Sequence, residues 1–175
     1  MENLALNNIL TRSSVRTYLP DRQIQENDIE LILKAGMAAP SAVNRQPWQF
    51  VVVRDKSTLR RLADSLPYAK MAAHASTAII PCGDKKNFLE GIDDSLWVQD
   101  LSAATENILL AAHALGYGGV WTCVYPHPER ENPVREILSI PDGIVPFAVI
   151  PIGVPANPPH IIDKWDPSKI HNEKW

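Results

Sequence analysis

The longest stretch of helical periodicity, Asp94 to Leu115, is the feature that most constrains what this chain can fold into. Its apolar residues recur every three or four positions, so they share one face of a helix of about six turns. Gly116 follows directly, in the place where a left-handed residue commonly ends a helix. We therefore expect a central helix against which shorter elements pack. Its apolar face consists of Trp97, Leu101, Ala104, Ile108, Ala111, Ala112 and Leu115.

Shorter elements alternate on both sides of this helix. Helical spacing predicts further helices at residues 2–11, 26–38, 56–63 and 133–138. Apolar runs, several rich in β-branched residues, predict strands at 48–53, 78–80, 120–125 and 146–152. Asn132 is expected to cap the last helix, and Gly83-Asp84 to close the second strand. The alternation indicates a single domain over residues 1–175, with a sheet covered by helices in an α+β or α/β arrangement. The pattern does not fix the strand order.

The composition excludes several classes of protein. A chain of 175 residues that is 45% hydrophobic can form one domain with a substantial core. The net charge of -3 gives no basic footprint for nucleic acid, so nucleic acid is not an expected partner. The pairs Arg60-Arg61 and Lys85-Lys86 are isolated and are interpreted as solvated edges.

Cysteine usage and hydropathy exclude further classes. The two cysteines, Cys82 and Cys123, are far apart, and Cys123 with His127 lacks the additional ligands of a metal site. No zinc site or disulfide framework is expected. No segment approaches the roughly 20 apolar residues of a membrane span, and the N-terminus lacks a basic region followed by an apolar stretch. A soluble, cytoplasmic protein that does not bind a membrane is expected.

The basic segment 12–16, with the sequence Arg-Ser-Ser-Val-Arg, is the first candidate site. Two guanidinium groups, two hydroxyls and several backbone donors within five positions suit a phosphate group. The same residues also suit an exposed junction between a helix and a loop, with serines as caps. Taken alone, the segment favours the exposed junction.

A second candidate is the proline-rich loop at residues 38–50, which lies between a predicted helix and a predicted strand. Its amide side chains offer paired donors and acceptors that match the edge of a planar heterocycle, and its prolines limit the entropy lost on binding. The alternative is a structural connection in which Asn44 adopts a left-handed conformation. Composition does not decide between the two. The 15 prolines of the chain concentrate here and in two later stretches, which predicts long fixed loops.

The glycine-rich segment 116–123 is interpreted as a helix end and a tight turn. Its glycines follow a helix and precede a strand, which is the reverse of the order in dinucleotide-binding loops. The chain also lacks the phosphate loop of kinase-type enzymes, the HExxH motif of metalloproteases and the GxSxG motif of many hydrolases. Enzymes of those classes are disfavoured.

Together these segments resemble the nitroreductase family in its short form, over nearly the whole chain. The resemblance rests on the basic segment, on the loop 40–48 with the sequence Pro-Ser-Ala-Val-Asn-Arg-Gln-Pro-Trp, on the helix 107–112 leading into Gly116 to Trp121, and on the tail 164–171. The loop that ends in Pro-Trp is the most specific of them.

The resemblance implies an α+β, nitroreductase-like fold, with a central, mostly antiparallel sheet flanked by helices. It also implies an intertwined homodimer with two flavin mononucleotide (FMN) sites, each built from both chains. Arg12 and Ser14, with Ser13 between them, would hold the phosphate, and Lys164 would close that end of the site. Arg16 would lie towards the ribityl chain and the pyrimidine edge of the flavin.

Other residues would surround the ring. Pro40, Ser41 and Asn44 of the partner subunit would line it, and the segment Trp121, Thr122 and Cys123 would approach its N5 side. Two positions depart from the commoner family pattern: Cys123 stands where many relatives have glycine, and Lys164 stands where arginine is more frequent.

The implied activity is a ping-pong reaction in which NADH or NADPH reduces the flavin, and the flavin then reduces a nitroaromatic, a quinone or a similar acceptor. Arg16 is the candidate for stabilising negative charge on the reduced ring, and Lys70 is a weaker candidate. The five histidines, His74, His113, His127, His160 and His171, are assigned structural or solvated roles.

Alternatives remain at this stage. The same scaffold resembles dehalogenases, azoline oxidases and flavin-destroying enzymes, and a flavin-binding module without turnover is a further possibility. The sequence names neither the electron acceptor nor the preferred nicotinamide.

Overall fold

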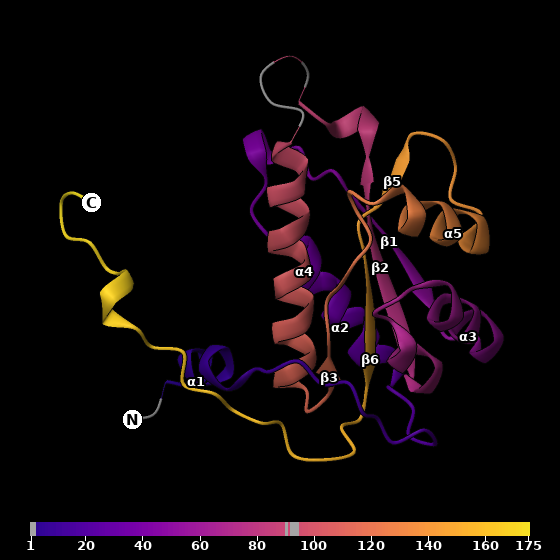
Figure 1. Ribbon diagram of the computed structural model, residues 1–175, viewed down its shortest axis with the longest axis horizontal. Coiled ribbons are helices and arrows are strands. Elements are labelled where there is room, and N and C mark those ends of the chain that lie inside the picture. The colour runs from indigo at the N-terminus through magenta and orange to yellow at the C-terminus, as the bar shows by residue number, and fades with distance from the viewer. Residues whose placement is uncertain (1–2, 90, 92–94) are drawn as a thin grey trace.

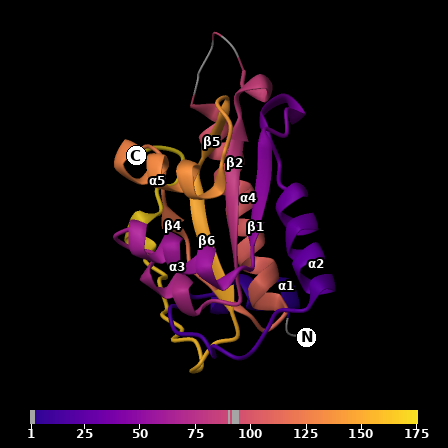
Figure 2. The ribbon, with the colours of Figure 1, turned by 90° about the vertical axis from the view of Figure 1, so that its right-hand side faces the viewer.

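A six-stranded antiparallel sheet forms the middle of the computed structural model, which describes residues 3–89, 91 and 95–175. Its main path runs β1-β2-β6-β3, while β4 also pairs with β6 and β5 also pairs with β2. Figure 2 shows β2 between β1 and β6. The strands are β1 (Trp48–Val53), β2 (Thr77–Asp84), β3 (Gly118–Gly119), β4 (Thr122–Cys123), β5 (Ile144–Pro146) and β6 (Ala148–Gly153).

Helices cover both faces of this sheet, as Figure 1 shows. One face carries α2 and α4, and the other carries α3 and α5. The five α-helices are α1 (Leu4–Thr11), α2 (Glu26–Met37), α3 (Lys56–Ser65), α4 (Leu96–Ala114) and α5 (Pro128–Leu138). The short 3-10 helices are η1 (Ala42–Asn44), η2 (Lys70–His74), η3 (Lys85–Asn87) and η4 (Pro167–Lys169). The α+β class and the mostly antiparallel sheet predicted from the family resemblance are confirmed.

The alternation of side chains along β2 divides the core into two layers. Ile79 packs among the residues of α2 and α4, whereas Ala78 and Ile80 pack among those of α3 and α5. Successive side chains of a strand point to opposite faces, so a sheet covered on both sides needs apolar residues at every position. This explains why residues 78–82 of β2 form an unbroken apolar run rather than an alternating one.

The central helix is close to its predicted position. It begins at Leu96, and the predicted start at Asp94 lies outside the described residues, as does the Glu2 start of the first predicted helix. Gly116 has a φ of +83° and ends the helix, as predicted. The N–H of Gly116 donates to His113 and the N–H of Tyr117 to Ala112, which satisfies carbonyls that the helix itself leaves unpaired.

Two predicted strand boundaries were wrong. β2 continues through Gly83 and Asp84, because Gly83 pairs with Trp48 across the sheet and is not a turn. A Cβ at Gly83 would lie 2.7 Å from the Trp97 ring, so glycine serves close packing there. Of the predicted strand 120–125, only Thr122–Cys123 is a strand, β4, and the short strand β3 lies just before the predicted start.

Two further predictions needed correction. The predicted strand 146–152 is divided into β5 and β6 at Phe147, whose N–H donates to Pro81 of β2. Helix α5 starts at Pro128, with Pro133 inside it, so Asn132 is not its cap. Proline is favoured at the first position of a helix, so Pro128 was the signal from which the earlier start could have been predicted.

Candidate functional site

The basic segment 12–16 lies between α1 and β3, and the glycines of β3 determine its position. The Val15 N–H donates to the Gly119 carbonyl at 3.0 Å, and Ser14 forms an isolated parallel bridge with Gly119. A Cβ on Gly118 would lie 2.6 Å from the Cβ of Val15. Glycine is therefore required here for the close approach of the basic segment, a contact that the predicted helix end and tight turn did not include.

Tyr18 fastens the far end of the basic segment to the sheet. Its hydroxyl lies 2.7 Å from the Val15 carbonyl and 3.0 Å from the Pro151 carbonyl, and the residue is only 4% exposed. Burial raises the pKa of the Tyr18 hydroxyl far above its ordinary value, although the positive charge of Arg16 opposes the shift. The hydroxyl therefore stays protonated and able to donate.

Contacts with α4 fix the near end of the segment. The Arg12 Nε lies 3.0 Å from the Glu106 carboxylate, and the Arg12 side chain is 18% exposed. The Thr11 hydroxyl donates to the Asn7 carbonyl, so its oxygen is left to accept from His113 Nε2 at 2.9 Å. Burial, and secondly the charge of Arg12, lower the pKa of His113. These contacts fix the start of the segment against α4.

A cavity of about 950 Å³, here called the basic cavity, opens beside this segment. Lys164 from the C-terminal tail also lines it, so the structure brings together the predicted phosphate residues and the predicted closing lysine. The Ser13 hydroxyl is buried and has no hydrogen-bond partner among the described residues. The predicted residues that line the cavity are Arg12, Ser13, Ser14, Arg16 and Lys164, joined by Glu106 and residues 160–163, which were not predicted.

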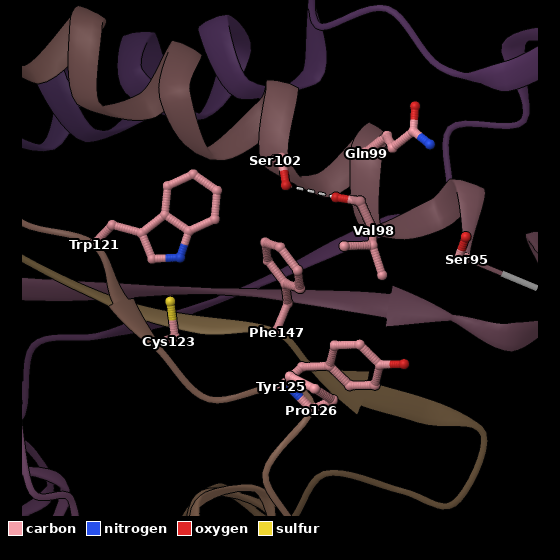
Figure 3. Close-up of a pocket in the computed structure, with 9 residues that line it drawn as sticks. All are labelled: Ser95, Val98, Gln99, Ser102, Trp121, Cys123, Tyr125, Pro126 and Phe147. Atoms are coloured by element: carbon pink, nitrogen blue, oxygen red, sulfur yellow. Dashed lines mark hydrogen bonds between the residues drawn. The ribbon is translucent and has the colours of Figure 1, made fainter.

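A second cavity of about 550 Å³, here called the aromatic cavity, lies between α4 and the segment that follows β3. Figure 3 shows Trp121, Cys123 and Phe147 on one side of it and residues of α4 on the other. The Trp121 and Phe147 rings are tilted against each other with centroids 5.6 Å apart. Trp121 and Cys123, both predicted as site residues, thus contact a cavity with an apolar, aromatic wall.

Thr122 differs from its two neighbours. Its side chain is buried and donates a 2.6 Å hydrogen bond to the Val149 carbonyl, so it secures β4 to β6. It does not line either cavity. Any contact that residue 122 makes with a ligand would come from its backbone, as the family resemblance implies.

A polar stripe along α4 connects the two cavities, and the sequence predictions missed it. The aromatic cavity is lined by Ser95, Gln99 and Ser102, and the basic cavity by Glu106. Spacings of four, three and four residues place these side chains on one helical face. Ser102 and Glu106 are neighbours on successive turns, about 5–6 Å apart at Cβ. The two cavities therefore adjoin, and the spacing of the stripe was the signal that could have revealed it.

The loop after α2 does not line either cavity of its own subunit. Asn44 has a left-handed conformation, with a φ of 54°, which was the feature of the alternative interpretation of this loop as a structural connection. Pro40 and Asn44 are exposed, and Ser41 is half-buried. Their predicted contact with a flavin of the partner subunit stays a prediction. Lys70 does not line the cavities either; its Nζ lies 3.4 Å from the Asp64 carbonyl.

The described residues offer neither a metal-binding cluster nor a membrane-spanning helix. Among residues 3–89, 91 and 95–175, no three His, Cys, Asp or Glu side chains gather where they could hold a metal ion. Within the same residues, no helix is long and apolar enough to cross a membrane. Cys82 is buried, and burial raises the pKa of its thiol to about 12, so it acts as a core residue.

Comparison with known proteins assigns the chain to a family. The family model described as "Nitroreductase family" matches residues 9–97 and 63–154. An Archaeoglobus fulgidus protein named for NADH dehydrogenase and NAD(P)H nitroreductase activity is 49% identical over 170 residues, which cover 95% of this chain and 96% of the relative.

Solved structures agree with this assignment. A Bacteroides thetaiotaomicron structure with the same kind of name has a TM-score of 0.93 at 44% identity, covering 100% of both chains. A Desulfovibrio desulfuricans structure described as "a putative nitroreductase in complex with FMN" has a TM-score of 0.83 at 30% identity, covering 100% of this chain and 99% of the other. The chain therefore belongs to the nitroreductase family of FMN-dependent oxidoreductases.

Proposed function

We propose that this protein is an FMN-dependent NAD(P)H oxidoreductase that reduces nitroaromatic, quinone or similar acceptors in a ping-pong reaction. The observation that carries the proposal is the position of two unlike cavities on adjacent turns of α4. One is rich in cations and hydroxyls, and the other has an aromatic wall. FMN has a phosphate at one end and a flat ring system at the other, so its two ends match the two cavities in kind.

The basic cavity fits a phosphate on its own chemistry. Arg12 uses its Nε for Glu106, and its two terminal nitrogens have no hydrogen-bond partner within the described part of the chain. The buried, unpartnered Ser13 hydroxyl is a donor of the kind that usually has a partner in folded proteins. In this proposal Arg12, Ser13, Ser14 and Lys164 hold the phosphate, and Glu106 keeps the Arg12 guanidinium in place.

The ring end depends on a different set of side chains. When bound, FMN would supply the redox chemistry that carries electrons from NADH or NADPH to the second substrate. Trp121 and Phe147 exclude water from the aromatic cavity, and Cys123 contributes its exposed thiol to the wall. Arg16 provides a positive charge at the edge of the basic cavity, where it would stabilise negative charge developing nearby.

A second copy of the chain completes the site in this proposal. Helix α1 has no buried residue, and its Leu4 is 80% exposed. The C-terminal tail runs past α1 away from the sheet (Figure 1) and exposes Trp165 and Ile162. Large apolar side chains gathered on projecting segments are typical of surfaces that become buried in an assembly. Such a dimer would bring Pro40, Ser41 and Asn44 of the partner subunit to the ring.

The relatives support the same activity. The Archaeoglobus fulgidus protein is named for NADH dehydrogenase and NAD(P)H nitroreductase activity, and the Desulfovibrio desulfuricans structure is a complex with FMN.

Anaerobic titration tests the proposal. The purified protein, supplied with FMN, should show a bound flavin absorbance band that NADH or NADPH bleaches, and a nitroaromatic or quinone should restore it. Product analysis of the second half-reaction separates acceptor reduction from dehalogenation, azoline oxidation or flavin destruction. A protein that never binds FMN would refute the proposal, and a bound flavin that neither nicotinamide reduces would indicate a binding module without turnover.

A further inference from the structure

The loop from Ser41 to Gln46 has an unusual backbone. Val43, Asn44 and Gln46 all have positive φ values, of 50°, 54° and 49°. Asparagine adopts this left-handed region readily, but a β-branched residue such as valine seldom does. Val43 is also 82% exposed, so packing inside its own subunit does not explain its conformation. Strained backbone of this kind persists only where other contacts hold it, and it gathers at functional sites.

One side chain outside the loop holds this conformation. The Ala42 N–H donates to Asp100 Oδ1 at 2.9 Å. Within the described residues, this is the only hydrogen bond between residues 41–45 and another element. The remaining bonds are internal. The Asn44 N–H donates to the Ser41 carbonyl and the Arg45 N–H to the Ala42 carbonyl. The Gln46 N–H donates to the Ser41 hydroxyl, and the Gln46 amide donates to the Asn44 side chain.

Asp100 is an energetically unfavourable residue for a purely structural contact. It lies on α4, is 7% exposed, and forms no ion pair with any described residue. Burial of a carboxylate without a cation is unfavourable, and an apolar residue of similar size often stabilises a fold more. A charged acceptor, however, makes a stronger hydrogen bond to a backbone N–H than a neutral one does. The loop conformation, rather than the fold, is what this residue secures.

We propose that Asp100 is a positioning residue that holds the strained loop 41–46 in the conformation in which it contacts the flavin ring of the partner subunit. The inference rests on the proposed function, in which Ser41 and Asn44 of the partner subunit line that ring. Gln99 and Ser102, on either side of Asp100 in sequence, line the aromatic cavity. One short stretch of α4 thus lines the aromatic cavity of its own subunit and also holds the loop 41–46, which in this proposal contacts the flavin of the partner subunit.

The main test replaces Asp100 in the full-length protein and measures FMN binding by quenching of flavin fluorescence. Asp100→Leu fills the same space without an acceptor, so the fold should be retained or become more stable while FMN affinity falls about tenfold. Asp100→Asn keeps an acceptor oxygen and should stay within about threefold of the native affinity. Asp55→Ala, which removes the cap of α3 far from the loop, controls for a general loss of stability.

A second-site change separates positioning from a structural role. Val43→Asn lowers the strain of the left-handed conformation, so the pair Asp100→Leu and Val43→Asn should recover part of the affinity that Asp100→Leu loses. The loss should also be equal for riboflavin and for FMN, because the loop acts at the ring and not at the phosphate. The circular dichroism of the bound flavin should change in Asp100→Leu and return towards the native signal in the double variant.

The outcomes are distinct. If the native protein fails to bind FMN, the proposed function fails. If the native protein binds FMN and Asp100→Leu binds it equally well with an unchanged spectrum, only the role of Asp100 is refuted. A double variant no better than Asp100→Leu would likewise overturn the positioning role.

Discussion

The basic segment 12–16 and the loop 41–46 are held in opposite ways. The basic segment is fixed at both ends. Arg12 pairs with Glu106 on α4, and the Tyr18 hydroxyl links Val15 to Pro151 of the sheet. Between them, the Val15 N–H donates to Gly119. The loop has a strained backbone and a single hydrogen bond to the rest of the described chain. The first is held in place within one subunit, whereas the second exposes the apolar side chain of Val43, and we propose that it contacts the partner subunit. The phosphate end of the proposed site should therefore be robust, and the ring end dependent on assembly.

The largest effect is expected from Arg12→Ala. Loss of a charge-assisted contact with phosphate, together with the unpaired Glu106 left in the cavity, should weaken FMN binding about a hundredfold. Riboflavin, which lacks the phosphate, should bind as in the native protein. Fluorescence titrations of both flavins at one salt concentration check this. An equal loss for both would show that Arg12 shapes the site without contacting the phosphate.

A smaller effect is expected from Gly118→Ala. The new Cβ would lie 2.6 Å from Val15, so the basic segment must shift, and FMN affinity should fall about tenfold. Gly143→Ala is the matched control, since Gly143 has a φ of +89° and no atom within 4 Å of an added Cβ. That control should lower the melting temperature but leave FMN affinity intact. Native affinity in Gly118→Ala would mean that the basic segment is less fixed than the contacts indicate.

The smallest effect is expected from Tyr18→Phe, which removes the hydroxyl that joins Val15 to Pro151. The free energy of unfolding should fall by about 1 kcal/mol and FMN affinity by about threefold. Burial raises the pKa of Tyr18 above its ordinary value of 10.0, so the contribution of this tyrosine to the free energy of unfolding is complete below pH 10.0. Above pH 10.0 the tyrosine ionises in the unfolded chain, and the stability difference between the native protein and Tyr18→Phe should shrink as the pH rises. Thermal unfolding of both proteins across alkaline pH measures this, and a constant difference would contradict it.

Local patterns predicted the elements whose cause is local. The face of α4 and the left-handed Gly116 follow from spacing and from the conformational preferences of those residues, and the structure confirms them. The residues of the basic cavity were predicted as one group only through the family resemblance, because Arg12 and Lys164 lie at opposite ends of the sequence.

The missed features have causes far away in the chain. Gly83 looked like a turn because its real constraint, the Trp97 ring, lies on another element. Gly118 looked like part of a helix end because Val15, which needs the space, is a hundred residues earlier. Asp100 gave no signal of its own, since its partner is a backbone N–H in a distant loop.

The two faces of α4 have different tasks: one packs in the core, and the other lines the aromatic cavity. Its apolar face belongs to the core, while Gln99 and Ser102 line the aromatic cavity. Substitutions at those two positions can reshape the cavity without touching a core residue. If the proposed function holds, substitutions at positions 99 and 102 should change which electron acceptors the site takes, at little risk to folding. A single helix thus carries core residues on one side and cavity-lining residues on the other.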